Sequence, residues 1–256
     1  MRLAVLLKTV PDLVEELALD EDARTLLFDE MSYVPSEWDD QALEEALIIK
    51  EESGAEVTVI AVDTGDVDTM LFTALAKGAD YAVKIVGDFD AAMSNWQKAR
   101  VLADYLGRGD FDAVLSGVQA IDDVDGQLPG LVAGFLGWPH ASVITEVRVA
   151  GGSHLQLRQE YAGGLVAELE TVTPIVVGVQ AARKPPRYAS VAKVRQVAKS
   201  ATIDEVEADV AEARLAGVEY VRPVAAGHAE MIEGDIDEVV DRIVAILEER
   251  NLLRRA

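Results

Sequence analysis

The sequence predicts an α/β fold: a doubly wound, mostly parallel sheet of the Rossmann-like type, with an antiparallel meander and a C-terminal arm that ends in a helix. Three observations lead to this prediction. Apolar runs of strand length alternate with helical patterns over roughly the first 140 residues. The chain of 256 residues is 50% hydrophobic, enough to bury one large core. It has no cysteine, so neither a disulfide framework nor a Cys-ligated metal is expected.

The first half of the chain contains four successive strand–helix pairs. Strands are expected where apolar, often β-branched residues form a short run bounded by polar residues or glycine, at residues 3–7, 57–62, 81–86 and 111–115. Helices are expected where apolar residues recur at helical spacing, at residues 39–52, 67–80, 96–109 and 127–138. Gly78 is a typical helix stop, and Pro129 is acceptable in a first helical turn.

The pattern changes after residue 140. Three strand-like runs, at residues 141–149, 154–161 and 165–172, are separated by Gly-Gly pairs, which predicts an antiparallel meander. Residues 174–180 form one more buried strand that could rejoin the main sheet.

The C-terminal part is predicted to be a separate region. Residues 1–200 are expected to form the nucleotide-binding domain, and residues 201–256 an arm and a helix. The helix at residues 235–253 has one apolar stripe, made of Ile236, Val239, Val240, Ile243 and Leu247. The stripe could pack on the protein's own body or on a partner subunit.

Charge narrows the range of partners. The chain has 46 acidic and 23 basic residues, a formal net charge of -23. A negative field repels phosphates, so we expect neither nucleic acid nor an anionic membrane as a partner. No apolar run approaches the ~20 residues of a membrane span, and the N-terminal run is too short for a signal peptide. We therefore expect a cytoplasmic protein without direct membrane insertion.

The segment "SGVQAIDDVDGQLPG", residues 116–130, connects a strand to a helix. Ligands of doubly wound sheets bind beyond the carboxyl ends of the strands, where backbone N–H groups and the helix dipole favour an anion. Gly117 would let a ligand approach the backbone, and Gly126 and Gln127 open the helix. Two alternatives remain open: a capped connection without a ligand, and a three-aspartate site for a divalent metal.

The sequence contains no pattern typical of a catalytic site. There is no Gly-x-Ser-x-Gly elbow, Walker loop or Gly-x-Gly-x-x-Gly fingerprint, and the three histidines are far apart. We therefore expect no catalytic residues and no metal site in this chain.

Five stretches resemble the beta (small) subunit of electron-transfer flavoproteins. They occur in order along nearly the whole chain: "LLKTVPD", "EWDDQALEEALIIKE", "ALAKGAD", "GVQAIDDVDGQLPGLVAGFLGWP" and "PPRYASVAKVRQVAK". The resemblance implies an alpha subunit whose FAD takes electrons from a flavin-dependent dehydrogenase of the acyl-CoA dehydrogenase type, as in fatty acid oxidation. A quinone oxidoreductase then accepts these electrons, and the beta subunit holds AMP as a structural ligand.

The resemblance also implies that the sheet is of the adenine-nucleotide-binding type, and it implies the AMP contacts. They are Leu6, Ser36, Asp39, Thr64, Gly117, Gln119, Ala120, Ile121, Asp122, Asp123, Asp125, Gly126, Gln127 and Leu128. Backbone N–H groups of residues 119–123 and 126–128 would surround the phosphate, and Asp39 would contact the nucleoside. Because a carboxylate repels phosphate, the loop aspartates are expected to cap N–H groups or to bond ribose or base donors.

Residues 180–200 carry six basic and no acidic residues. Such a run often forms a solvated loop and helix face. The resemblance implies instead a partner-recognition loop, in which Val191 anchors a dehydrogenase beside Arg187, Tyr188 and Lys193. A lone apolar residue among charges suits an anchor with a polar rim.

The sequence departs from the family pattern at several positions, and two other functions stay open. Ser36-Glu37 replaces Asn-Pro, and Val118 stands where Lys or Arg is frequent. One alternative is a bifurcating relative with FAD in place of AMP and NADH as donor, although the threonines typical of that group are absent from "GDFDAAMSNW". The other is a stand-alone nucleotide-binding module.

Overall fold

We analysed a computed structural model of the chain. It describes residues 1–20, 25–89, 93–123, 126–210, 220–221, 229 and 231–253. The chain divides into two compact units, Met1–Val218 and Glu219–Ala256. Asp125, one of the predicted ligand contacts, lies outside the described residues.

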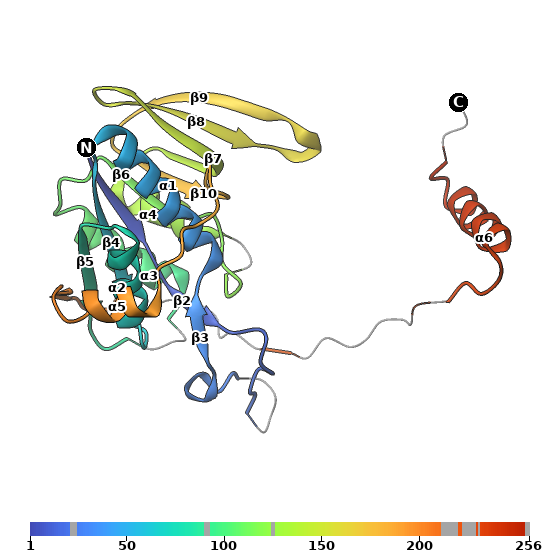
Figure 1. The fold of residues 1–256 in the computed structure, drawn as a ribbon, viewed down its shortest axis with the longest axis horizontal. Coiled ribbons are helices and arrows are strands. Elements are labelled where there is room, and N and C mark those ends of the chain that lie inside the picture. The colour runs from blue at the N-terminus through green and yellow to red at the C-terminus, as the bar shows by residue number, and fades with distance from the viewer. Residues whose placement is uncertain are drawn as a thin grey trace. The chain divides into compact units, whose positions relative to one another are not determined.

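The first unit is built on one large sheet (Figure 1). Its nine described strands follow the order β11-β5-β4-β1-β6-β10-β7-β8-β9. Their bounds are β1 (Arg2–Leu6), β4 (Glu56–Val62), β5 (Tyr81–Val86), β6 (Ala113–Gly117), β7 (His140–Gly151), β8 (His154–Glu160), β9 (Val166–Val172), β10 (Ile175–Val179) and β11 (Asp204–Glu207). Neighbours pair in parallel from β11 to β7, whereas β8 is antiparallel to both β7 and β9. The predicted doubly wound sheet, its meander and the return of residues 174–180 to it are confirmed.

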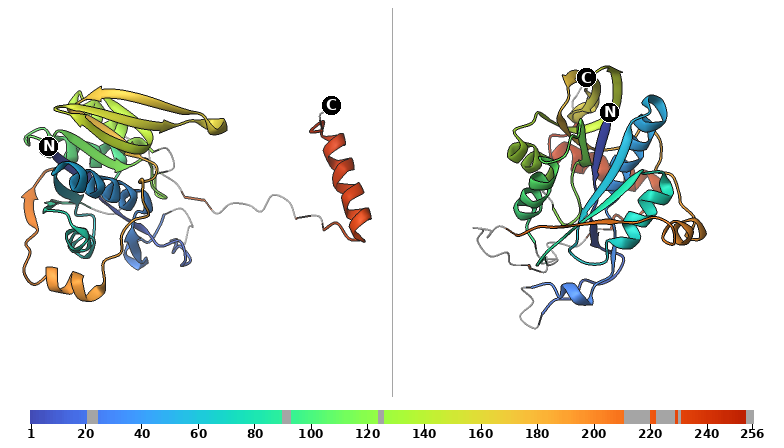
Figure 2. Two further views of the ribbon diagram at one scale, coloured as in Figure 1. Left: turned by 45° about the horizontal axis from the view of Figure 1, so that its top comes forward. Right: turned by 90° about the vertical axis from the view of Figure 1, so that its left-hand side faces the viewer.

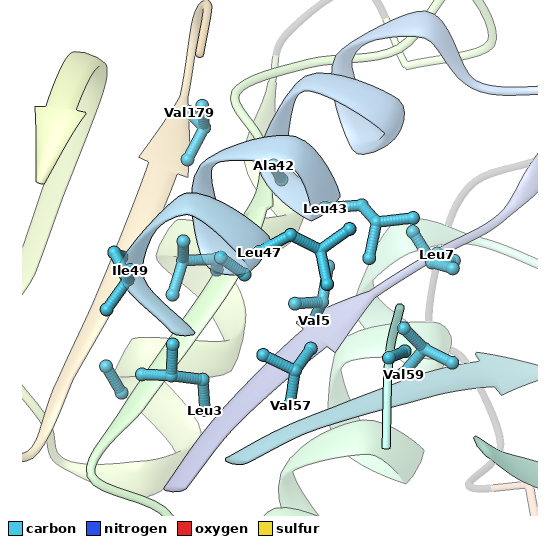
Figure 3. Packing of buried hydrophobic residues seen from close by; sticks show 14 of the residues in the cluster. Leu3, Val5, Leu7, Ala42, Leu43, Leu47, Ile49, Val57, Val59 and Val179 are labelled. Carbon is cyan, nitrogen blue, oxygen red and sulfur yellow. The ribbon is translucent and has the colours of Figure 1, made fainter. Parts of the chain in front are cut away.

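Helices cover both faces of this sheet (Figure 2). One core cluster contains residues of α1 (Glu37–Ser53) and α2 (Asp68–Lys77), and the other contains residues of α3 (Asn95–Leu106) and α4 (Gln127–Leu136). Figure 3 shows Leu43 and Leu47 of α1 directed toward Val5 and Val57 of the sheet. The strands of the sheet centre are buried on both faces, which explains why they read as continuous apolar runs.

Local signals set the helix ends. Gly54 adopts a left-handed conformation after α1, with φ of 73°, and its N–H bonds the carbonyl of Lys50. Ser94 and Gln97 form a capping box at the start of α3. In the second unit, Asp235 and Glu238 do the same for α6 (Ile236–Glu249).

The structure also contains short elements that the sequence did not predict. These are an antiparallel pair, β2 (Thr9–Pro11) and β3 (Tyr33–Pro35), two 3-10 turns, η1 (Phe28–Glu30) and η2 (Ala162–Gly164), helix α5 (Val191–Val197), and the edge strand β11. Most span only three or four residues, too few for a hydrophobic period to be read. Strand β11 belongs to the first unit, Met1–Val218. Among the described helices, none is long and apolar enough to cross a membrane.

Candidate functional site

The candidate site lies at the carboxyl ends of three neighbouring strands, β1, β4 and β6. In parallel sheets these ends share one edge, where ligands usually bind. A cavity of about 20 Å³, roughly the room of one water molecule, opens there. It is lined by Leu6, Leu7, Lys8, Asp39, Val62, Thr64, Lys98, Leu102 and Leu128. Four of the predicted contact residues, Leu6, Asp39, Thr64 and Leu128, are therefore brought together by the fold.

Asp39 connects the start of α1 to two strand ends. Its Oδ1 accepts a hydrogen bond from the Gly117 N–H at 2.9 Å, and its Oδ2 accepts one from the Lys8 N–H at 3.0 Å. Burial raises the pKa of Asp39 to about 7, although Lys8 and the two backbone donors act in the opposite direction. A Cβ at position 117 would lie 2.6 Å from Asp39 Oδ1, so this contact requires glycine. Asp39 therefore holds the backbone of Lys8 and Gly117 in place, and it also lines the cavity.

The loop after β6 is stabilised by its own carboxylate. Asp123 Oδ1 accepts a hydrogen bond from the Ala120 N–H at 2.5 Å, and the Asp123 N–H donates to the Ala120 carbonyl at 3.1 Å. The Gly126 N–H then donates to the Asp123 carbonyl at 3.0 Å. Gly126 has a φ of 58°, and a Cβ there would lie 2.6 Å from the Val118 carbonyl oxygen. Asp123 thus caps an N–H group, as expected for the loop aspartates, and the amide of Ala120 is already bonded.

Two lysines meet at this loop. Lys8 Nζ lies 2.5 Å from Asp122 Oδ1 and 3.4 Å from Asp123 Oδ2, and Lys98 Nζ lies 3.8 Å from Asp122 Oδ2. Burial lowers the pKa of Lys8, but Asp122, Asp123 and Asp39 outweigh burial and raise it above its usual value. Burial and the charge of Lys8 lower the pKa of Lys98. Across the described part of the chain, no group of three or more histidine, aspartate or glutamate side chains could hold a metal ion.

Sequence reasoning missed both lysines as site residues. Lys8 follows the first strand directly, inside the quoted stretch "LLKTVPD". Lys98 is four and eight residues before Leu102 and Leu106, so it lies on the apolar face of α3. A charged residue on the apolar face of a predicted helix could have indicated Lys98 as a site residue. Val118, at the position where a basic residue is frequent in the family, is buried instead.

A second cavity adjoins the first at Asp39 and Leu7. It has a volume of about 250 Å³ and lies between α1 and α2. Its lining includes Ser36, whose backbone N–H bonds the Lys8 carbonyl at 3.0 Å. The Ser36 hydroxyl is buried and has no hydrogen-bond partner among the described residues. This hydroxyl is therefore available to a bound molecule.

The remaining predicted contacts are distributed around the loop. Ala120 and Leu128 are buried, Gln119 is half-buried, Gln127 starts α4, and Ile121 is 41% exposed. Gly126 is the N-cap of α4. Because glycine has no side chain, it cannot accept a hydrogen bond from the N–H groups in the first turn of the helix.

The predicted docking segment follows β10 and runs along α1. Arg187 is ion-paired with Glu44 at 2.8 Å and with Glu51 at 2.6 Å, so its guanidinium is engaged within the chain. Arg183 makes the equivalent pairs with Glu45 and Glu52, each at 2.9 Å.

Beyond these ion pairs the segment faces outward. Tyr188 and Val191 are 83% and 59% exposed, and Lys193 is also exposed. Ser190 caps α5 by accepting a hydrogen bond from the Lys193 N–H, so Val191 is the first residue of a short, ordered helix.

Comparison with known proteins agrees with this arrangement. A model of the electron transfer flavoprotein domain matches residues 25–211. The chain is 34% identical to the electron transfer flavoprotein subunit beta of Methylophilus methylotrophus, over 97% of this chain and 98% of that protein. The chain belongs to the beta (small) subunit family of electron transfer flavoproteins. The beta subunits of Clostridium acetobutylicum and Bacillus subtilis are 29% and 28% identical, over 99% and 96% of this chain and 100% and 97% of their own lengths. A beta subunit of such a flavoprotein implies an alpha subunit as its partner and a flavin in the complex.

Proposed function

We propose that this chain pairs with an alpha subunit, binds AMP as a structural ligand, and helps the alpha subunit's FAD to accept electrons from a flavin-dependent dehydrogenase and pass them to a quinone oxidoreductase. The observation that carries the AMP assignment is the pair of adjoining cavities at the ends of β1, β4 and β6. Leucine side chains offer apolar walls for a base, and two ammonium groups offer counter-charges for a phosphate. In this proposal the chain binds AMP and the alpha subunit and has no redox chemistry of its own.

The residues present fit an adenylate in their chemistry. The buried Ser36 hydroxyl can bond a nucleoside, because it has no hydrogen-bond partner among the described residues. The loop has to rearrange for binding, because the smaller cavity measures about 20 Å³.

FAD, held mainly by the alpha subunit, would supply the redox chemistry in this complex. This chain would contribute the surface that a dehydrogenase recognises. Val191 is exposed at the start of α5, with Tyr188 and Lys193 beside it, as suits an apolar anchor with a polar rim. We assign the apolar stripe of α6 to contact with the alpha subunit.

Nucleotide content tests the proposal. The complex with the alpha subunit is purified, denatured, and the released nucleotides are separated and quantified. One FAD and one AMP per pair of subunits is the expected result. Two FAD without AMP would reject the proposal in favour of the bifurcating type, which NADH-dependent flavin reduction would then identify. A chain that is stable alone and does not bind an alpha subunit would indicate a stand-alone module.

A further inference from the structure

The connecting segment, residues 181–190, joins β10 to α5 and lies outside any helix or strand. Three of its backbone N–H groups donate hydrogen bonds to side chains of α1. They are the N–H groups of Ala182, Arg183 and Arg187, which donate to Gln41, Glu45 and Glu44 at 2.9, 3.0 and 2.9 Å. Backbone N–H groups away from water need such partners. The side chains of α1 therefore determine the path of the connecting segment.

Glu45 bonds the connecting segment at a point where three elements meet. Its side chain is fully buried, at 0% exposure. Oε2 accepts the Arg183 N–H, whereas Oε1 accepts the Arg183 Nε–H at 2.9 Å and the Val147 N–H at 2.8 Å. Hydrogen bonds to a carboxylate are stronger than those between neutral groups. One carboxylate on α1 thus fixes both the connecting segment and β7, the first strand of the meander.

Helix α5 lies between this attachment and a second one. The helix contacts α2, with Val194 and Val197 half-buried, and the chain then pairs with β5 as strand β11. Val191, the first residue of α5, is exposed. A recognition surface that is ordered before binding loses less conformational entropy when its partner docks. The attachment at Glu45 therefore favours binding at Val191 without touching the partner.

We propose that Glu45 is a positioning residue for recognition of the dehydrogenase: it holds the Arg183 backbone against α1 and β7 and so presets the orientation in which Val191 meets its partner. The role of Val191 rests on the proposed function, whereas the order of the connecting segment rests on the hydrogen bonds of Glu45.

The test uses Glu45→Gln in the complex with the alpha subunit. Glutamine has a similar size but only one acceptor oxygen, so in either orientation its NH₂ group faces a donor of Arg183 or Val147. Glu52→Gln is the matched control. Glu52 lies on the same helix and pairs with the same guanidinium, at 2.9 Å from Nη1, but its side chain is 52% exposed. An acyl-CoA dehydrogenase with its acyl-CoA substrate reduces the complex, and the kcat and the KM for the complex are measured.

Glu45→Gln should raise this KM at least threefold and leave kcat within twofold of wild type, because a less ordered segment loses more entropy on docking. Glu52→Gln should change neither constant. In a Val191→Ala background, Glu45→Gln should raise the KM no further, since its effect acts through Val191. An unchanged KM in Glu45→Gln, or additive effects of the two substitutions, would overturn the inference.

Hydrogen exchange followed by mass spectrometry gives a readout that needs no dehydrogenase. Exchange of residues 182–190 should become at least tenfold faster in Glu45→Gln and stay unchanged in Glu52→Gln. Leu106→Ala controls for general destabilisation, because Leu106 is buried in the other core cluster, with α3 and α4. It should lower the melting temperature without selectively accelerating exchange in the connecting segment.

The inference and the proposed function can fail separately. If exchange accelerates in Glu45→Gln but Val191→Ala leaves electron transfer unchanged, the docking assignment of Val191 fails. If Val191→Ala raises the KM but Glu45→Gln alters neither KM nor exchange, the positioning role fails and the docking assignment stands. If Glu45→Gln does not fold, Gln41→Met removes the acceptor of the Ala182 N–H without leaving a buried charge unpaired. Gln41→Met should then raise both KM and exchange, and unchanged values would overturn the inference.

Discussion

Arg187 donates hydrogen bonds to both carboxylate oxygens of Glu44, from Nη2 at 2.8 Å and from Nε at 2.9 and 3.1 Å. The Arg187 backbone N–H also donates to Glu44 Oε2, at 2.9 Å. The two residues are 143 positions apart, and Glu44 is almost fully buried in α1. This pair, together with Arg183 and Glu45, holds the segment after β10 against α1. Helix α5 begins four residues after Arg187.

Removal of Arg187 should destabilise the chain. In Arg187→Ala the Glu44 carboxylate stays buried without its cation, a loss of roughly 3 kcal/mol, at the low end for buried pairs because Arg187 is 30% exposed. Urea denaturation of the complex, followed by circular dichroism, gives this difference. The double variant Arg187→Met, Glu44→Gln should recover part of the loss, since no buried charge is then left unpaired. If Arg187→Ala is as stable as wild type, the Arg187–Glu44 ion pair contributes little to stability.

The titration of Asp39 should appear in the pH dependence of stability. Its pKa in the folded chain, about 7, is above the ordinary value of 3.8, so between these pH values the folded chain holds a proton that the unfolded chain has lost. The unfolding free energy therefore falls as pH rises through this range, by about 1.4 kcal/mol per pH unit for one group, and levels off above pH 7. The difference between wild type and Asp39→Asn isolates this contribution. A difference that does not vary between pH 4.5 and 7 would contradict the prediction.

Gly117→Ala should damage the site, because its Cβ would lie 2.6 Å from Asp39 Oδ1 and 2.7 Å from Trp38 Cβ. Crowding of this kind costs roughly 1–3 kcal/mol, and the shifted loop should retain less AMP. The melting temperature and the nucleotide content of the complex measure both effects. Gly134→Ala, in α4, is the control: nothing lies within 4 Å of its Cβ, so it should be neutral or slightly stabilising. Equal behaviour of the two variants would refute the argument.

Val191→Ala should weaken recognition of the dehydrogenase without affecting the fold. Val191 is 59% exposed, so its truncation should cost the fold little, whereas an interface anchor contributes more than about 1 kcal/mol to binding. Electron transfer from a dehydrogenase should therefore need at least fivefold more of the complex, at an unchanged melting temperature. Val172→Ala, at the end of β9, is a control with similar exposure, 48%. If electron transfer from the dehydrogenase is unchanged in Val191→Ala, Val191 is not an anchor for that partner.

The sheet was predictable because its strands and helices carry local signals. The run of residues 57–62 is β-branched and apolar, and Gly54 and Gly78 stop the helices on either side of it. Strand β11, "DEVE", carries no such signal: its acidic side chains suit an edge position, and Lys84 pairs with Glu205 at 2.9 Å. Strand β11 forms because it pairs with β5, and its own composition does not predict it.

The site was only partly predictable. Family resemblance indicated Leu6, Asp39, Thr64 and Leu128, and the fold brings all four to one cavity. The bond from the Gly117 N–H to Asp39 spans 78 positions, and a contact of that kind has no local sequence signal. For the same reason the engagement of Arg187 by Glu44 was not foreseen from the basic character of its segment.

Strand β9 ends the sheet on the side of the meander. Glu168 and Glu170 stand on its exposed face, with half-buried residues between them. If two molecules paired edge to edge through β9, their glutamates would lie opposite one another on one face, and like charges in such positions oppose the pairing. The like charges on β9 thus disfavour association of two copies of this chain through the free edge of the meander.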